Sequence, residues 1–188
     1  MTTLEELRQQ LGDRLGDDLR RVTENPEAAA TLFPAAGRRY GREPLAGGWT
    51  TDEAARALLL SVLPPEHISE IYRYGDAAEK LAVLKALPLL PIGDHAVPLL
   101  EDALRTNDTR LVSAAVGPYA EHLGQQAWRH AVLKCVFMGV PLTRVHRLTE
   151  RADPELAAML RAFADERRAA GRDMPADALA LLDQLKEA

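Results

Sequence analysis

The chain has 188 residues, of which 47% are hydrophobic and 27% are charged, so it suits one domain with its own core and is not a disordered chain. It carries 23 basic and 28 acidic side chains, which give a formal net charge of −5. Nucleic-acid binding needs a basic face that neutralises phosphates, and this acidic balance therefore argues against nucleic acid as a partner.

The composition also bears on the cellular compartment. Cys135 is the only cysteine, which excludes an intramolecular disulfide. The first six residues include two acids, where a signal peptide would carry a basic region and then an apolar run. No apolar stretch approaches the roughly 20 residues that span a bilayer. We therefore expect a cytoplasmic protein with no membrane span.

The amino-acid usage favours helices over strands. Ala and Leu supply 61 residues, whereas Ile, Val, Phe, Tyr and Trp together supply 22. The first 22 residues place apolar side chains on one helical stripe, which Gly12 and Gly16 weaken. Asn25-Pro26 predicts the beginning of a second helix, which Pro34 bends or divides. Residues 44–50, with two consecutive glycines, form the clearest loop.

From Thr51 onward the sequence predicts helices separated by short turns. The helix that begins at Thr51 ends before Pro64-Pro65, and Pro65 begins the next one. Four further helices are expected, beginning near Asp76, Asp94, Asp108 and Gln125.

These four helices form two hairpins of similar length. The starts near Asp76 and Asp108 lie 32 residues apart, and the first helix of each hairpin carries a late proline, Pro88 or Pro118. This spacing is typical of HEAT-type repeats. Farther along, Asp153 caps a long helix and Pro175 begins the last one.

We therefore predict an all-α fold of about ten helices and no sheet, with helical hairpins in a right-handed HEAT-like or α-solenoid array. The expected organisation is a single all-helical domain over residues 1–188. Its N-terminal helices and Gly/Pro loop occupy residues 1–50, and the helical-hairpin body occupies residues 51–188. In its core we expect two apolar stripes to pack on each other, namely Trp128, Val132 and Cys135 against Leu111, Ala115 and Tyr119.

Motifs for metals and phosphates are missing from the sequence. The five histidines show no zinc-ligand spacing, and Gly47-Gly48 lacks the lysine and the preceding strand of a phosphate loop. We expect no metal and no cofactor. Cys135 lies on an apolar stripe, where cysteine usually behaves as a small core residue.

Residues 102–110 gather two acids, two arginines and an asparagine around one interhelical turn. Helix capping explains Asp108, and an Asp102–Arg105 pair at helical spacing is a structural alternative for the rest. The functional alternative is that this turn presents donors and acceptors to a ligand. A guanidinium fork suits an anionic group or a carboxylate.

Lys134 interrupts a segment that is apolar nearly all round. A lysine desolvated there could act as a base or an imine-forming amine, or its stem could lie along the helix while its ammonium reaches water. We expect the functional surface to combine the turn with this neighbouring helix. The candidate ligand- or partner-binding residues are Arg105, Asn107, Asp108, Arg110, Tyr119 and Lys134.

Three stretches, at residues 102–110, 128–137 and 164–172, resemble the EboA family of bacterial and plastid-associated proteins. The resemblance covers roughly residues 70–185. It implies a protein encoded beside a membrane prenyltransferase and enzyme-like proteins, in a gene cluster that makes or moves a specialised metabolite. The family's label, metabolite traffic protein, describes a genetic role and carries no catalytic motif to these positions.

Two functions remain open on this basis. The first is a non-catalytic helical-repeat module that binds a small metabolite or a partner enzyme, with proteins of the same cluster, including the prenyltransferase, as candidate partners. The alternative is a small-molecule enzyme whose pocket lies between helices and uses Lys134, His130 or Tyr119, or the acids Asp102 and Asp108, as acid–base groups. An open groove favours the first, whereas a closed pocket with convergent polar groups favours the second.

Overall fold

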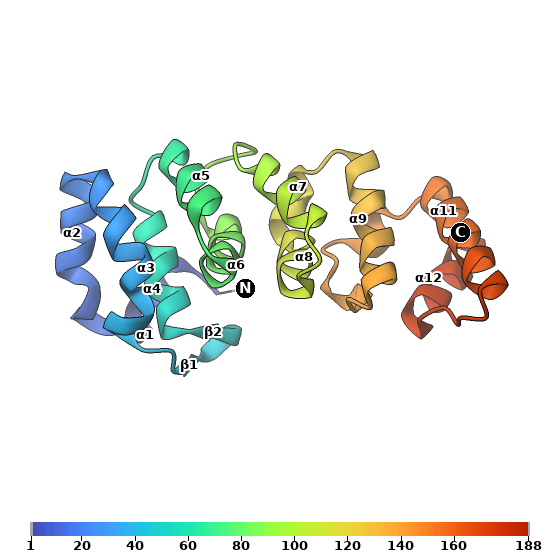
Figure 1. The fold of residues 1–188 in the computed structure, drawn as a ribbon, viewed down its shortest axis with the longest axis horizontal. Helices are drawn as coiled ribbons and strands as arrows, with labels where there is room; N and C mark the ends of the chain where they lie inside the picture. Colours follow the sequence, from blue (N-terminus) through green and yellow to red (C-terminus); the bar gives the residue numbers. More distant parts are fainter. Residues whose placement is uncertain (1, 188) are drawn as a thin grey trace. The chain divides into compact units, whose positions relative to one another are not determined.

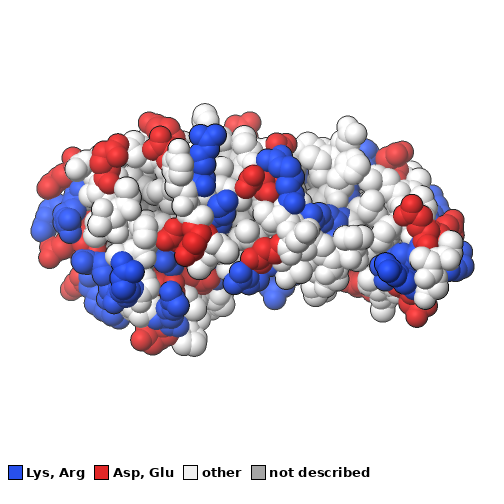
Figure 2. All heavy atoms as spheres, in the orientation of Figure 1, with Lys and Arg blue, Asp and Glu red and all other residues white. Residues whose placement is uncertain are grey.

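The computed structural model describes residues 2–187, and the side chains of residues 2–185 (Figure 1). The described chain is helical apart from one two-stranded sheet, which confirms the all-α prediction. No helix among the described residues is long and apolar enough to cross a membrane. The face drawn in Figure 2 carries Lys and Arg interspersed with Asp and Glu.

The chain divides into two compact units, residues 1–99 and residues 100–188. The boundary falls inside helix α7, Val97–Arg105. Each unit has its own buried apolar core. The single domain expected over residues 1–188 stays a prediction.

The first unit begins with a broken helix. Helix α1 (Leu4–Leu11) is followed by a 3₁₀ turn, η1 (Gly12–Leu15), and then by α2 (Gly16–Glu24). Most of the apolar stripe is buried, namely Leu7, Leu11, Leu15 and Val22, but it does not form one continuous helix. Gly12 has φ of +60°, a conformation that favours glycine and ends α1.

Asn25 caps the next element as predicted, because its side chain accepts a hydrogen bond from the Glu27 amide at 3.2 Å. The cap leads into η2 (Pro26–Ala28) and α3 (Ala29–Tyr40). Pro34 lies inside α3 and does not divide it.

The loop over residues 44–50 contains a short antiparallel pairing, which differs from the expectation of no sheet. Strand β1 (Pro44–Leu45) pairs with β2 (Trp49–Thr50) across η3 (Ala46–Gly48). Positive φ angles at Gly47 and Gly48 allow the chain to reverse there. Trp49 is buried, and the ammonium of Lys85 lies 4.8 Å from its ring centroid.

Helix α4 (Thr51–Leu60) forms the centre of the first unit and packs on α1, α3 and α6. Nearly all its side chains are buried, including Asp52 and Arg56, whose carboxylate and guanidinium lie 2.6 Å apart. The remaining elements of this unit are α5 (Pro65–Tyr74), α6 (Ala77–Ala86) and η4 (Leu87–Leu89). Pro65 occupies the first turn of α5, as the sequence predicts.

After α7, the second unit contains η5 and η6 together with five helices. The helices are α8 (Thr109–Ala115), α9 (Gln125–Met138), α10 (Leu148–Arg151), α11 (Pro154–Ala169) and α12 (Ala176–Glu187). The 3₁₀ turns are η5 (Pro118–His122) and η6 (Leu142–Arg144).

The predicted caps at Asp76, Asp108 and Asp153 are confirmed, since each side chain accepts a backbone hydrogen bond at a helix start. The helix expected near Asp94 begins later, at Val97. Pro88 and Pro118 lie in 3₁₀ turns just after α6 and α8, so these prolines follow the α-helices instead of bending them.

The core expected in the second unit is present. Trp128, Val132 and Cys135 of α9 are buried, and so are Leu111, Ala115 and Tyr119, with α8 packed on α9. The guanidinium carbon of Arg151 lies 4.8 Å from the centroid of the Trp128 ring.

A polar network joins this core to α11. The Arg129 guanidinium donates to both carboxylate oxygens of Asp153, the shortest distance being 2.6 Å. Asp153 also accepts from the Leu156 amide and from Gln125. Arg151 donates to the carbonyls of Ala120 and Leu123 at 2.7 and 2.8 Å. The Arg129 contact holds the pKa of Asp153 well below its usual value.

Replacing Trp128 by Ala is expected to lower the free energy of unfolding by about 3–5 kcal/mol, because the ring is fully buried and leaves a cavity. Chemical denaturation followed by circular dichroism measures this loss. Phe137→Ala is the matched control, because the Phe137 side chain is 66% exposed. A loss below about 1 kcal/mol for Trp128→Ala would contradict the packing.

Asp153 is expected to make the stability of the second unit depend on pH. Its pKa is depressed in the folded state, so its contribution is complete above the unfolded value of about 3.9 and is lost as the pH falls below it. Asp153→Asn keeps a capping side chain but removes the charge. Melting temperatures between pH 6 and pH 2.5 should therefore fall less steeply in this variant than in the parent.

The control is Asp165→Asn, because the Asp165 side chain is 71% exposed and lies 2.8 Å from Arg168, which is also largely exposed. This variant should keep the parent's pH dependence. Equal slopes for all three proteins would show that the Arg129–Asp153 pair contributes nothing to acid sensitivity.

Candidate functional site

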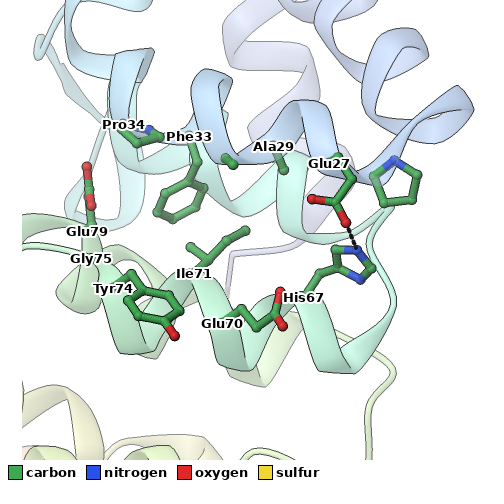
Figure 3. A pocket seen from close by; sticks show the side chains of 12 residues that line it. Glu27, Ala29, Phe33, Pro34, His67, Glu70, Ile71, Tyr74, Gly75 and Glu79 are labelled. Carbon is green, nitrogen blue, oxygen red and sulfur yellow. Dashed lines mark ion pairs between the residues drawn. The ribbon is translucent and has the colours of Figure 1, made fainter.

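A groove of about 230 Å³ lies in the first unit between α3 and α5 (Figure 3). Helix α5 contributes His67, Glu70, Ile71 and Tyr74. Their spacing of three and four residues places them on one face of the helix. Pro65 fixes where α5 begins and therefore which face it turns toward the groove.

The floor of the groove is apolar. Phe33 and Ala29 of α3 are buried, and Ile71 of α5 is half-buried beneath them in the view of Figure 3. At the rim, Tyr74 has a side chain that is 81% exposed. The groove is thus open to solvent and offers a mostly apolar lining to a small molecule.

Arg56 of α4 holds the Phe33 segment in place. Its Nε donates to the Phe33 carbonyl at 3.1 Å, and its guanidinium carbon lies 5.5 Å from the centroid of the Phe33 ring. Arg56 is itself paired with Asp52 inside the core. The position of the groove floor therefore depends on a buried ion pair of the central helix.

The charged groups of the groove lining are acidic. Glu27, Glu70 and Glu79 line the groove, and none of its described lining residues is Lys or Arg. The Glu27 carboxylate lies 3.5 Å from Nε2 of His67, and Nδ1 of His67 is enclosed with no hydrogen-bond partner. Figure 3 places Glu27 and His67 at one end of the groove and Glu79 at the other.

Gly75 closes the end of the groove near Glu79. A Cβ at this position would lie 2.8 Å from the Ile71 carbonyl oxygen and 3.0 Å from the Glu79 Cβ, so a larger residue would push α5 and α6 apart. Glu79 is held by the α6 cap, because its Oε2 accepts from the Asp76 amide at 3.0 Å. These contacts fix one carboxylate beside the apolar floor.

The sequence-predicted turn lies in the second unit, between α7 and α8. Arg110 donates to both oxygens of Asp108, at 3.0 and 2.6 Å, and holds the pKa of Asp108 below its usual value. Arg105 lies 3.4 Å from Asp102 and is 70% exposed. Asn107 is exposed. The Arg105–Asp102 contact is the local pair that the sequence offered as the structural alternative, whereas the Arg110–Asp108 pair was not predicted.

The two candidates outside the turn differ in exposure. Tyr119 is buried in η5, with its ring 4.8 Å from that of His122, whereas Lys134 is half-buried on α9. His130, named in the enzyme alternative, is exposed. A second hollow of about 380 Å³ lies among residues 142–149 of the second unit and α12, and its lining includes none of these three residues.

The Cys135 thiol and the possible metal ligands offer no reactive site among the described residues. Burial raises the pKa of the Cys135 thiol to about 12, which keeps it protonated within the core. Among the described residues, no group of three or more His, Cys, Asp and Glu side chains is placed to hold a metal ion.

Sequence reasoning missed the groove entirely. The available signal was the stripe of His67, Glu70, Ile71 and Tyr74, which mixes polar and apolar residues on one helical face. A helical face that carries a glutamate and a histidine beside apolar residues is rarely buried completely in a core. Its partner, α3, is distant in sequence, so the cavity could be seen only once the two helices were placed.

Comparison with known proteins gives one family. The family model described as metabolite traffic protein EboA matches residues 29–183, a span that includes most of the groove lining and the whole 102–110 turn. No curated protein and no solved structure matches the chain. The match covers most of the sequence, and the chain therefore belongs to the EboA family of metabolite traffic proteins.

Proposed function

We propose that this protein is a non-catalytic module of helical hairpins that binds a small metabolite during the making or movement of a specialised metabolite. The groove between α3 and α5 is the proposed binding site. The observation that carries this proposal is the open, apolar groove in a chain whose family is described as handling metabolites.

The proposal is supported by the separation of apolar and charged residues in the groove lining. Ile71, Ala30 and Pro34 offer accessible apolar surface above the buried Phe33 and Ala29, and each square ångström of apolar ligand surface removed from water contributes about 25 cal/mol. Glu27 and Glu79 lie at opposite ends and Glu70 lies between them, so the carboxylates can orient a ligand. Because the rim is exposed at Tyr74, a ligand can enter and leave without a large rearrangement of the unit.

Filling the groove is expected to abolish metabolite binding. Ala30 lines the groove and is exposed, so Ala30→Phe should occupy the cavity without disturbing the core. Small molecules that co-purify with the protein from producing cells, identified by mass spectrometry after denaturation, should be lost from this variant. Ala162→Phe, at an exposed position of α11, is the control and should retain them.

If both variants carry the same compounds as the parent, the groove is not the binding site. If the parent itself carries none while the other cluster proteins are present, the metabolite-binding proposal fails. Melting temperatures of the three proteins must agree for either comparison to count.

We also propose that the 102–110 turn, with Lys134, contributes a surface for a partner enzyme of the same gene cluster, whereas Tyr119 is buried and is not part of that surface. The supporting observation is that Arg105 and Arg110 are 70% and 60% exposed on a turn held by the Asp108 cap. A guanidinium that already pairs within its own turn can still offer its remaining N–H groups to a partner carboxylate.

Arg110→Ala and Lys134→Met are expected to reduce metabolite output in cells while leaving the melting temperature unchanged. The physical reason is the loss of exposed donors, with little loss of packing. Arg168→Ala, which removes an exposed arginine paired with Asp165 on α11, is the control. Full output from stable Arg110→Ala and Lys134→Met proteins would remove this surface from consideration.

A further inference from the structure

We propose that the ligand of the α3–α5 groove has an apolar body and a protonated amine. This inference rests on the proposed function of the groove and names the chemical class that the groove takes. It follows from the negative charge of the groove lining, from the apolar character of its floor and from the absent backbone N–H of Pro34.

The apolar body follows from the floor. Ile71 is half-buried and Ala30 and Pro34 are exposed, so these three present aliphatic surface, and the volume of about 230 Å³ admits one small molecule. Phe33 already has a cation, Arg56, over its ring, and Arg56 is fixed by Asp52. Phe33 is thus already covered by the protein, and the apolar surface left for a ligand belongs to Ile71, Ala30 and Pro34.

The positive charge follows from the rim. Three carboxylates line the groove, and no Lys or Arg among the described lining residues offsets them. Glu70 has no ion-pair partner among the described residues, and Glu27 faces only His67. An ammonium beside Glu70 is attracted by that carboxylate at close range and more weakly by Glu27 and Glu79 at the two ends, whereas an anion there would be repelled.

The backbone adds an acceptor to the same wall. Pro34 has no N–H, so the carbonyl of Ala30, four residues earlier in α3, lacks its ordinary helical donor. Both Ala30 and Pro34 line the groove. A carbonyl in this state accepts a hydrogen bond from an ammonium, which carries three donors, and cannot bond a carboxylate.

The rim also carries an aromatic face. The exposed ring of Tyr74 lies beside Glu70 along α5 (Figure 3). An ammonium near such a ring is attracted by its π face, with a preference that neutral alcohols lack. Carboxylates, carbonyl and ring thus favour the same ligand charge.

Three probes of one shape test this inference: 4-phenylbutylamine, 4-phenylbutan-1-ol and 4-phenylbutanoate. Binding is followed by the shift of the Ile71 methyl signals in a protein labelled at isoleucine methyl groups, and affinity is taken from the titration. We expect the amine to bind about tenfold more tightly than the alcohol, since several partly exposed charge contacts act together. The butanoate should bind most weakly. The advantage of the amine should shrink at high salt.

Glu70→Gln is expected to remove most of the amine's advantage and to leave the alcohol unchanged. Glu66→Gln is the matched control, because Glu66 lies on the same helix and is exposed, but does not line the groove. If both variants lose amine affinity equally, the amine responds to the overall negative charge of the first unit. That result would overturn a specific cation site at Glu70.

The outcomes separate this inference from the function on which it rests. Equal affinities for amine and alcohol, both shifting Ile71 and both blocked by Ala30→Phe, would overturn the cationic ligand and leave the groove as a metabolite site. If no probe shifts Ile71 at millimolar concentration, the groove does not bind small molecules and both proposals fail.

Discussion

The buried pair of Asp52 and Arg56 is the interaction on which the first unit depends. Helix α4 is enclosed by its neighbours, and burying two charges there is costly unless each is fully engaged. Arg56 meets this condition through the Asp52 carboxylate and the Phe33 carbonyl, and its guanidinium carbon lies 5.5 Å from the centroid of the Phe33 ring. The same arginine therefore stabilises the packing of the central helix and fixes the position of the groove floor.

In the second unit a half-buried arginine is likewise held by hydrogen bonds, but its main acceptors are neutral backbone carbonyls. Arg151 binds the carbonyls of Ala120 and Leu123, which end the segment before α9, and covers the ring of Trp128. Arg129 and Asp153 then join α9 to the start of α11. In each unit an arginine both satisfies backbone acceptors and lies over an aromatic ring of the core, which combines directional bonds with apolar contact.

Local signals in the sequence predicted the helices well. Caps at Asp76, Asp108 and Asp153, and proline at the first turn of α5, depend on residues within one helical turn of each other. The break at Gly12 and the late start of α7 at Val97 were not predicted, because both depend on how the chain is turned toward the core. The groove could not be predicted, since Phe33 and Ile71 lie on helices that are brought together only by tertiary packing, α3 against α4 and α5 against α6. The charged turn was visible in the sequence, yet its role as a binding surface stays a prediction.

The two tryptophans of the chain have a consequence for how its organisation can be observed. Trp49 is buried in the first unit beneath Lys85, and Trp128 is buried in the second beneath Arg151. Each unit thus contains one enclosed indole, and indole emission moves to longer wavelength when unfolding admits water. A chain that keeps only one of them reports the opening of a single unit, so fluorescence alone can show whether residues 1–99 and 100–188 unfold together or in sequence.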